Sequence, residues 1–285
     1  MLNIKIRYNT RSYIPLILPS VFILTTALFL QFVREAACKS PEAMRYQGGL
    51  RNSTDDRKLN AKQLETVLKN LREKTGFLEM NFDENGFLNL GDRTKFEGGS
   101  ATARSLITAA IESNRAIDLE AHNSSNKVAF ARLARPVIFQ NRSSGAIIDV
   151  YPLELDFNDF KKLRGDNKVL AAFDIGFVIL HELGHAVLNL SDRLESVNDV
   201  GECEEYINRI RRELNLPQRL NYIAQTIRSP LTMTRASADM AELIFSHSDD
   251  KKVQKLYLRW EAYTVGPVRD NVDSILLKPS TTASR

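Results

Sequence analysis

Residues 181–190 read HELGHAVLNL and follow the almost uniformly apolar run VLAAFDIGFVIL at 169–180. Together the two stretches predict one long, largely buried helix. Two of the four histidines in the chain, His181 and His185, stand four residues apart on it, and Glu182 follows the first of them. Positions four apart lie one turn apart on the same face of a helix, so both imidazoles can reach one metal ion.

The chemistry of this motif is that of a catalytic zinc site. Two imidazoles, one further protein ligand and a water molecule form the open arrangement that such sites use. Zinc lowers the pKa of its water to about 7, so Glu182 can take the proton as the water attacks a carbonyl, and can return it to the departing amine. The alternative is a packed helix with two core histidines. Three ionisable groups are costly to bury without partners, however, and a metal ion supplies a partner.

A third ligand has to come from outside the motif. In one zincin class the third ligand is a histidine six residues after the second motif histidine. That class also has a glycine three residues after the second motif histidine. A serine and a leucine stand at those positions here, which excludes that class. The remaining candidates are acidic residues near the start of the following helix: Asp199, Glu202, Glu204 and Glu205. The apolar stripe of that helix leaves Glu205 facing solvent and places Glu202 and Glu204 on its two flanks. Helical phase therefore favours Glu202 or Glu204, and Asp199 only if the helix begins earlier.

The segment after the motif is similar to a known family. HELGHA and the later GECEEYINRIRRELNLPQRLNY resemble zincin metallopeptidases with a glutamate third ligand, and more closely the metallopeptidase domains of bacterial secreted effectors and toxins. The matching positions are Asn208, Arg211, Glu213, Leu214, Leu216, Pro217, Arg219 and Tyr222, with Asn215 where the family has glycine. The resemblance covers residues 170–222. It implies a zincin fold, peptide hydrolysis, bound Zn²⁺ and a third ligand at Glu202.

Other single residues allow weaker predictions. Tyr222 or Tyr206 can stabilise the oxyanion opposite the zinc, as a phenol or histidine does in related enzymes, although ordinary packing is the simpler interpretation of each. Cys203 lies on the apolar stripe of its helix and is predicted to be core. Trp260 is also predicted to pack in the core. His247, in the polar stretch SHSDD, is predicted to lie in a solvated loop.

The N-terminal residues 1–38 predict a signal-anchor or a signal peptide. Residues 12–33 carry no charge, and about 20 such residues span a bilayer as a helix. More positive charge precedes this run than follows it, which keeps the N-terminus cytoplasmic and sends the rest across the membrane. The apolar core is longer than that of a usual signal peptide, Ala36-Ala37 is a passable cleavage site, and Cys38 could carry a lipid. We therefore expect a single-pass membrane anchor with an extracytoplasmic C-terminal domain, or a secreted protein.

The rest of the chain predicts a linker at 39–57, one domain at 58–276 and a disordered tail at 277–285. The domain pattern is α+β, in which strands come mostly before helices, and the resemblance makes it zincin-like, a small mixed sheet packed on the active-site helix. The predicted helices are 59–76, 100–113, the motif helix and 201–215. The predicted strands and hairpins are 77–90 around Asn85-Gly86, 116–122, 127–133, 145–155, 241–247 and 255–265.

Composition limits the function classes. A net charge of +4 is too modest to indicate nucleic-acid binding, and two cysteines exclude a disulfide framework. The predicted substrate is an extended polypeptide laid along an edge strand, for which GAIIDVY at 145–151 is the candidate. The alternatives are an inactive zinc-binding interaction module and a hydrolase of cell-wall peptide amides. The predicted partners are the substrate and, through the N-terminal helix, a membrane; the sequence assigns no oligomeric state.

Overall fold

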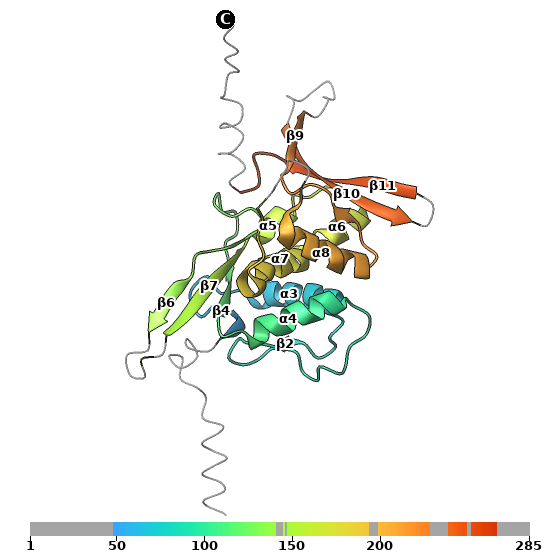
Figure 1. Cartoon of the computed structure of the whole chain (residues 1–285). Coiled ribbons are helices and arrows are strands. Elements are labelled where there is room, and N and C mark those ends of the chain that lie inside the picture. The colour runs from blue at the N-terminus through green and yellow to red at the C-terminus, as the bar shows by residue number, and fades with distance from the viewer. Residues whose placement is uncertain are drawn as a thin grey trace, which may run out of the picture. The chain divides into compact units, whose positions relative to one another are not determined.

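The computed structural model describes residues 48–140, 145, 147–193, 199–228, 239–249 and 252–266. The predicted membrane segment, Cys38, the first part of the linker and the tail at 277–285 lie outside the described residues. Within them the fold is α+β, as the sequence predicted, and it contains two sheets of four or more strands with helices between them (Figure 1).

The first sheet is mixed. Its strands run in the order β1-β4-β7-β5, with β6 also paired to β7; they are β1 (Gly49–Asn52), β4 (Ala116–Ala121), β5 (Ala131–Leu133), β6 (Val137–Gln140) and β7 (Ile147–Leu155). β1, β4 and β7 are parallel, whereas β5 and β6 pair antiparallel with β7. The strand predicted to receive the substrate is β7, and that prediction is wrong because β7 has a partner on each side. One edge of the sheet is formed by β5 and β6, and the other by β1.

The linker prediction is also wrong for its last part, since β1 belongs to the sheet. Leu50 and Arg51 are both buried, and Arg51 Nε donates to Asp118 Oδ1 on β4 at 2.6 Å. A strand of four residues that begins with the second of two glycines and contains an arginine has no hydrophobic alternation to predict it. The ion pair with Asp118 offsets the cost of burying the arginine.

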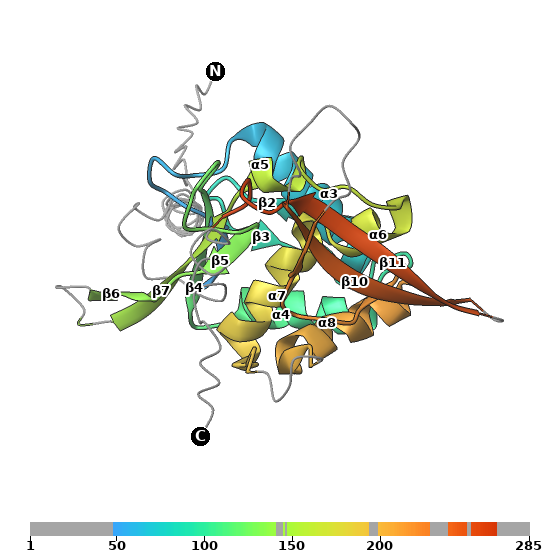
Figure 2. The same ribbon diagram turned by 90° about the horizontal axis from the view of Figure 1, so that it is seen from above.

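Three helices pack against this sheet and form the larger core: α3 (Ala61–Thr75), α4 (Ala101–Glu112) and α7 (Ile175–Leu188) (Figure 2). α3 and α4 agree with the predicted helices. Asn60 and Gln63 form a capping box at the start of α3, and Gly76 ends it in the left-handed conformation at φ 79°. The core joins strand residues such as Ile117 and Leu153 to Leu180 of α7 and its neighbours.

The second sheet is antiparallel and forms a smaller core. Its strands are β8 (Gln218–Arg219), β9 (Gln225–Arg228), β10 (Asp239–Asp249) and β11 (Lys252–Glu261). The predicted late hairpin is confirmed as β10 and β11, and Trp260 is buried against Phe130, as predicted. His247 was wrongly predicted to lie in a solvated loop. β10 continues through that polar stretch, pairs His247 with Gln254, and leaves His247 only 7% exposed.

The remaining elements are short or lie around the motif. β2 (Asn81–Phe82) and β3 (Leu88–Asn89) confirm the hairpin around Gly86, and the others are α5 (Phe157–Phe160), α6 (Asn167–Ala172) and α8 (Gly201–Glu213). The predicted long helix is divided into α6 and α7, because Asp174 caps α7 by accepting from Phe177 N at 3.1 Å. The stretch Asn167–Leu188 is long and apolar enough to cross a membrane. However, 61% of its most apolar 18-residue part is buried in the fold, as in a core helix.

Candidate metal centre

The motif helix α7 presents its two histidines at the boundary between the two cores. His181 and His185 lie on one face with ring centroids 4.9 Å apart. After Leu188 the chain leaves the helix at Asn189, which adopts the left-handed conformation at φ 53°. This turn returns the Leu190 carbonyl to the helix, where it accepts from His185 Nδ1 at 2.7 Å.

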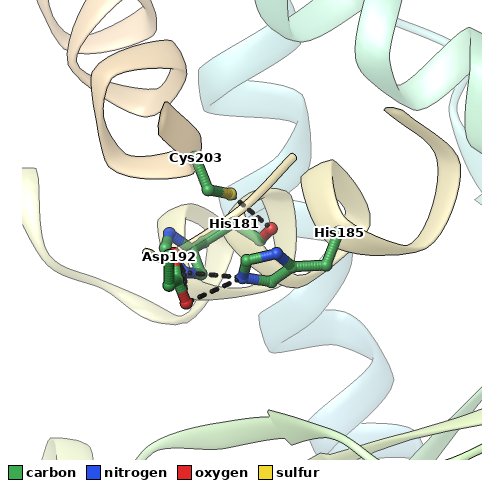
Figure 3. Close-up of side chains that lie close together, drawn as sticks. All are labelled: His181, His185, Asp192 and Cys203. Carbon is green, nitrogen blue, oxygen red and sulfur yellow. Dashed lines mark hydrogen bonds and ion pairs between the residues drawn. The ribbon is translucent and has the colours of Figure 1, made fainter. Parts of the chain in front are cut away.

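The same turn brings Asp192 against both imidazoles, as Figure 3 shows. Asp192 Oδ2 lies 3.0 Å from His185 Nε2 and 3.4 Å from His181 Nε2. The two Nε2 atoms are 3.2 Å apart. Tetrahedral zinc with ligand distances of 2.0–2.1 Å requires neighbouring donor atoms to be about 3.3 Å apart. The three side chains therefore fit one zinc ion without rearrangement.

The oxygen atom beside each Nδ1 indicates which nitrogen of each ring faces this point. Nδ1 of His185 donates to a carbonyl, and Nδ1 of His181 lies 3.2 Å from Glu204 Oε2. When protons occupy both Nδ1 atoms, both Nε2 lone pairs point at the same spot, which is favourable only around a cation. Burial alone would lower the pKa of His185, but the adjacent Asp192 carboxylate raises that pKa to about 10. The centre thus favours positive charge.

Glu204 anchors His181 from a buried ion-pair network. Its carboxylate pairs with Arg211 and lies 3.2 Å from Arg219 Nη1. Burial on its own would raise the pKa of Glu204, but the two guanidinium groups hold it well below its ordinary value. Glu204 therefore stays ionised and can orient the imidazole of His181. A carboxylate behind a ligand histidine is a common support of metal sites.

The structure does not bring Glu202 into this cluster. Glu202 is exposed, and its carboxylate accepts from Ser191 N at 3.1 Å. Glu205 is exposed, as its helical phase predicted, and Asp199 Oδ1 accepts from Gly201 N at 3.0 Å. Glu202 thus holds the backbone beside Asp192 instead of taking the ligand position suggested by the resemblance.

Asp192 is the site residue that the sequence reasoning missed. It stands seven residues after His185, one position beyond the histidine of the excluded zincin class. The signal that could have found it is Asn189, which tolerates the left-handed conformation that ends a helix and reverses the chain. Gly201, the first residue of α8, lets the chain pass close to Asp192. Its φ is 79°, and a Cβ there would come within 3.3 Å of Asp192 Cα.

Glu182 lies in the same site. Its Oε2 accepts from Leu133 N on β5 at 3.0 Å, so the carboxylate is held beside the edge strand. Burial raises the pKa of Glu182 above its ordinary value. A carboxylate whose pKa is raised toward neutrality is suited to exchange protons with a substrate.

Of the two candidate tyrosines, only Tyr222 is at the centre. Its hydroxyl donates to Asp192 Oδ2, and its ring stacks on His181 with centroids 6.0 Å apart. Tyr206 instead points its hydroxyl at Thr102 O on α4, 3.5 Å away.

Cys203 is buried, as predicted, and fixes the spacing of α7 and α8. Its Sγ donates to His181 O at 3.2 Å. A Cβ at Gly184 would lie 2.9 Å from that sulfur, so the two helices approach this closely only because residue 184 has no side chain. Cys203 also belongs to the group of possible metal donors with His181, His185 and Asp192.

A second group of possible metal donors lies on the first sheet and consists of Glu120, His122 and Glu154. Arg57 Nη1 lies 2.9 Å from Glu120, and Arg132 Nη2 donates to Glu154 at 2.5 Å. Since guanidinium groups already neutralise both carboxylates, this group lacks the uncompensated donors of the motif site.

The comparisons with known proteins give no assignment. No protein-family model matches the chain, and no curated protein or solved structure is significantly similar to it.

Proposed function

We propose that this chain is a zinc-dependent peptidase with His181, His185 and Asp192 as zinc ligands and Glu182 as general base. The observation that carries the proposal is the convergence of three donor atoms, 3.0–3.4 Å apart, beside the half-buried Glu182. Asp192 replaces Glu202 in the ligand set because its carboxylate lies against both Nε2 atoms.

Zinc bound there would polarise a water molecule and the carbonyl of the scissile amide. Glu182 takes a proton from the attacking water and delivers it to the nitrogen that leaves. Tyr222 holds Asp192 in place through its hydroxyl, and the same phenol is the proposed donor to the oxyanion. Glu204 keeps the proton of His181 on Nδ1, so that Nε2 remains a ligand.

An extended polypeptide is the proposed substrate because of the edge strand β5. Ala134 N donates to Pro152 O and Phe130 O accepts from Asp156 N, so alternate residues of this segment bond to β7. The main-chain groups of the residues between them face away from β7, and Leu133 N, one of these, reaches Glu182. A substrate strand paired along this edge would pass directly over the base. An edge strand beside an HExxH helix also supports the proposal of a zincin-like fold.

Two features weigh against the rival functions. An inactive zinc-binding module has no use for a half-buried Glu182 held at the site, since withdrawing that carboxylate from water costs free energy. A hydrolase of cell-wall amides would act on short peptides and would gain little from a strand edge.

The N-terminal anchor, and with it an extracytoplasmic or secreted location, is proposed on the sequence alone.

The test compares the zinc-loaded full chain in detergent with its Glu182→Gln variant on a peptide library. We expect Glu182→Gln to keep its zinc but to lose at least about 100-fold in cleavage rate, because glutamine cannot accept the proton. Glu205→Gln, an exposed carboxylate on α8, should change neither. Chelation should abolish cleavage, and added zinc should restore it. Cleavage by Glu182→Gln at the rate of the unmodified chain would refute the mechanism.

A further inference from the structure

A cavity of about 210 Å³, here called the side pocket, opens beside the candidate metal centre. His181, Glu182 and Tyr222 form part of its wall, and so do Ala129 and Ala131 at the edge strand. An apolar cavity of about 150 Å³ can hold a benzene molecule. The side pocket therefore has room for one medium or large amino-acid side chain next to the reacting amide.

The lining combines apolar walls with buried charge. Phe130, Phe173 and Phe177 supply much of the apolar surface, and Glu204, Arg211 and Arg219 also line the pocket. Glu204 and Arg211 are each 1% exposed. Their surroundings are therefore poor in water, which strengthens any charge interaction made there.

The lining holds two carboxylates, Glu182 and Glu204, and two guanidinium groups, Arg211 and Arg219, but Glu182 belongs to the proposed metal centre. Two guanidinium groups face one carboxylate, because Glu204 pairs with both Arg211 and Arg219. At the neighbouring metal centre, a divalent zinc ion would be balanced by Asp192 and Glu182. With zinc bound, one formal positive charge would therefore remain in the side pocket, and an uncompensated buried charge is costly.

Arg211 is the arginine with unused hydrogen-bonding capacity. It donates through Nε to Ala172 O and through Nη1 to Glu204 and Asn208. Among the residues that the structure describes, no hydrogen bond uses its Nη2. Arg219 is more fully engaged, since it donates to Glu204 and to the Asn221 and Tyr222 carbonyls.

We propose that the side pocket selects an acidic side chain, aspartate or glutamate, at a residue flanking the scissile bond, with Arg211 as its partner. This inference rests on the proposed peptidase function. The methylene groups of the acidic side chain lie against the phenylalanine rings, and its carboxylate accepts from Arg211 Nη2. The bound carboxylate also cancels the surplus charge, so an amide or an apolar side chain of equal size binds less well.

The experiment uses six peptides in two sets, which carry Glu, Gln or Leu on one side or the other of the same scissile bond. Cleavage is measured with the zinc-loaded full chain, and binding with its Glu182→Gln variant by fluorescence anisotropy. In one of the two sets we expect the Glu peptide to exceed both others at least about tenfold in kcat/KM and in affinity. Equal values, a preference for Leu, or no binding by any peptide would overturn the inference. A tenfold binding preference without any cleavage would leave the pocket assignment standing and refute the peptidase proposal.

Substitutions in the pocket give a second readout. Arg211→Gln should remove the preference for Glu over Gln, whereas Arg212→Gln, an exposed neighbour outside the pocket, should keep it. Because Arg211 is wholly buried and its replacement can unfold the domain, Val178→Phe serves as a second variant. Val178 lines the pocket and is only half-buried, so phenylalanine there fills space without changing charge. It should weaken binding of the Glu peptide more than of a matched Ala peptide. A folded Arg211→Gln protein that still prefers Glu would overturn the inference.

Discussion

Asp192 is held from two directions, by Tyr222 through its carboxylate and by Glu202 through the adjacent backbone of Ser191. We predict that Asp192→Ala loses zinc, because two imidazoles alone leave the metal without its third protein ligand. Glu202→Ala should retain zinc and should only loosen the loop. Metal content of the two purified variants, measured by atomic absorption, checks the prediction. A zinc-replete Asp192→Ala protein together with a zinc-free Glu202→Ala protein would restore Glu202 as the ligand.

Among the residues of the candidate site, the sequence predicted those whose positions follow from helical geometry. His181, Glu182 and His185 needed only the periodicity of one helix, and Tyr222 came from the resemblance. Asp192 depends instead on a chain reversal at Asn189, where a single backbone conformation decides which later residue meets the histidines. A pattern of residue types does not encode that direction.

Among the elements, α8 is tied to the N-terminus of α4 by Glu213. Glu213 Oε2 accepts from Ser100 Oγ at 2.6 Å and from Thr102 N at 3.0 Å. Although burial acts in the opposite direction, these hydrogen bonds lower the pKa of Glu213. A carboxylate at a helix N-terminus stabilises the unpaired N–H groups there.

We predict that Glu213→Gln lowers the free energy of unfolding by about 0.5–1 kcal/mol at pH 7, a modest value because Glu213 is exposed. Since the pKa of Glu213 is lower in the folded chain, its contribution is present above the ordinary glutamate pKa and is lost as pH falls below it. The difference between the two proteins should therefore shrink below about pH 4.5. Urea denaturation at several pH values measures it, with Glu205→Gln as the matched exposed control. A constant or growing difference at low pH would contradict this role.

The elements that the sequence missed lack regular patterns. β1 is four residues long with a buried arginine, and β6 exposes Val137 and Ile138 at the sheet edge, so neither alternates. The break between α6 and α7 was hidden by apolar residues on both sides of it. In contrast, α3, α4 and α8 were predicted because each carries a clear apolar stripe or terminal signal.

For the molecule as a whole, metal binding should be visible as stability. A ligand at 100 times its Kd stabilises the folded state by about 2.7 kcal/mol. We predict that zinc at that level raises the Tm of the chelated protein by roughly 5–10 °C, given a domain of this size. Differential scanning fluorimetry checks this, and Asp192→Ala should show no comparable shift. Equal Tm values with and without zinc would argue against a site formed by the native fold.

The predicted anchor concerns the chain beyond the described residues. Because the uncharged run at 12–33 is long and Ala36-Ala37 is only a passable cleavage site, we predict that the full-length protein needs detergent for extraction. The domain should be accessible to protease added outside intact cells, with a cytoplasmic protein as control. Quantitative release of a soluble form that starts near Cys38 would exclude the anchor but not the export.

The close approach of α7 and α8 at Gly184 bears on how distant relatives of this chain could be recognised. In an HExxH pattern the two middle positions count as spacers, open to any residue. Here a Cβ at the second spacer would meet the sulfur of the next helix, and the same helix carries Glu204 to the back of His181. A larger residue at 184 would push that carboxylate away from the imidazole. The spacer is therefore informative: a search pattern for this architecture should require glycine at the second spacer, a small residue where Cys203 stands, and a glutamate directly after it.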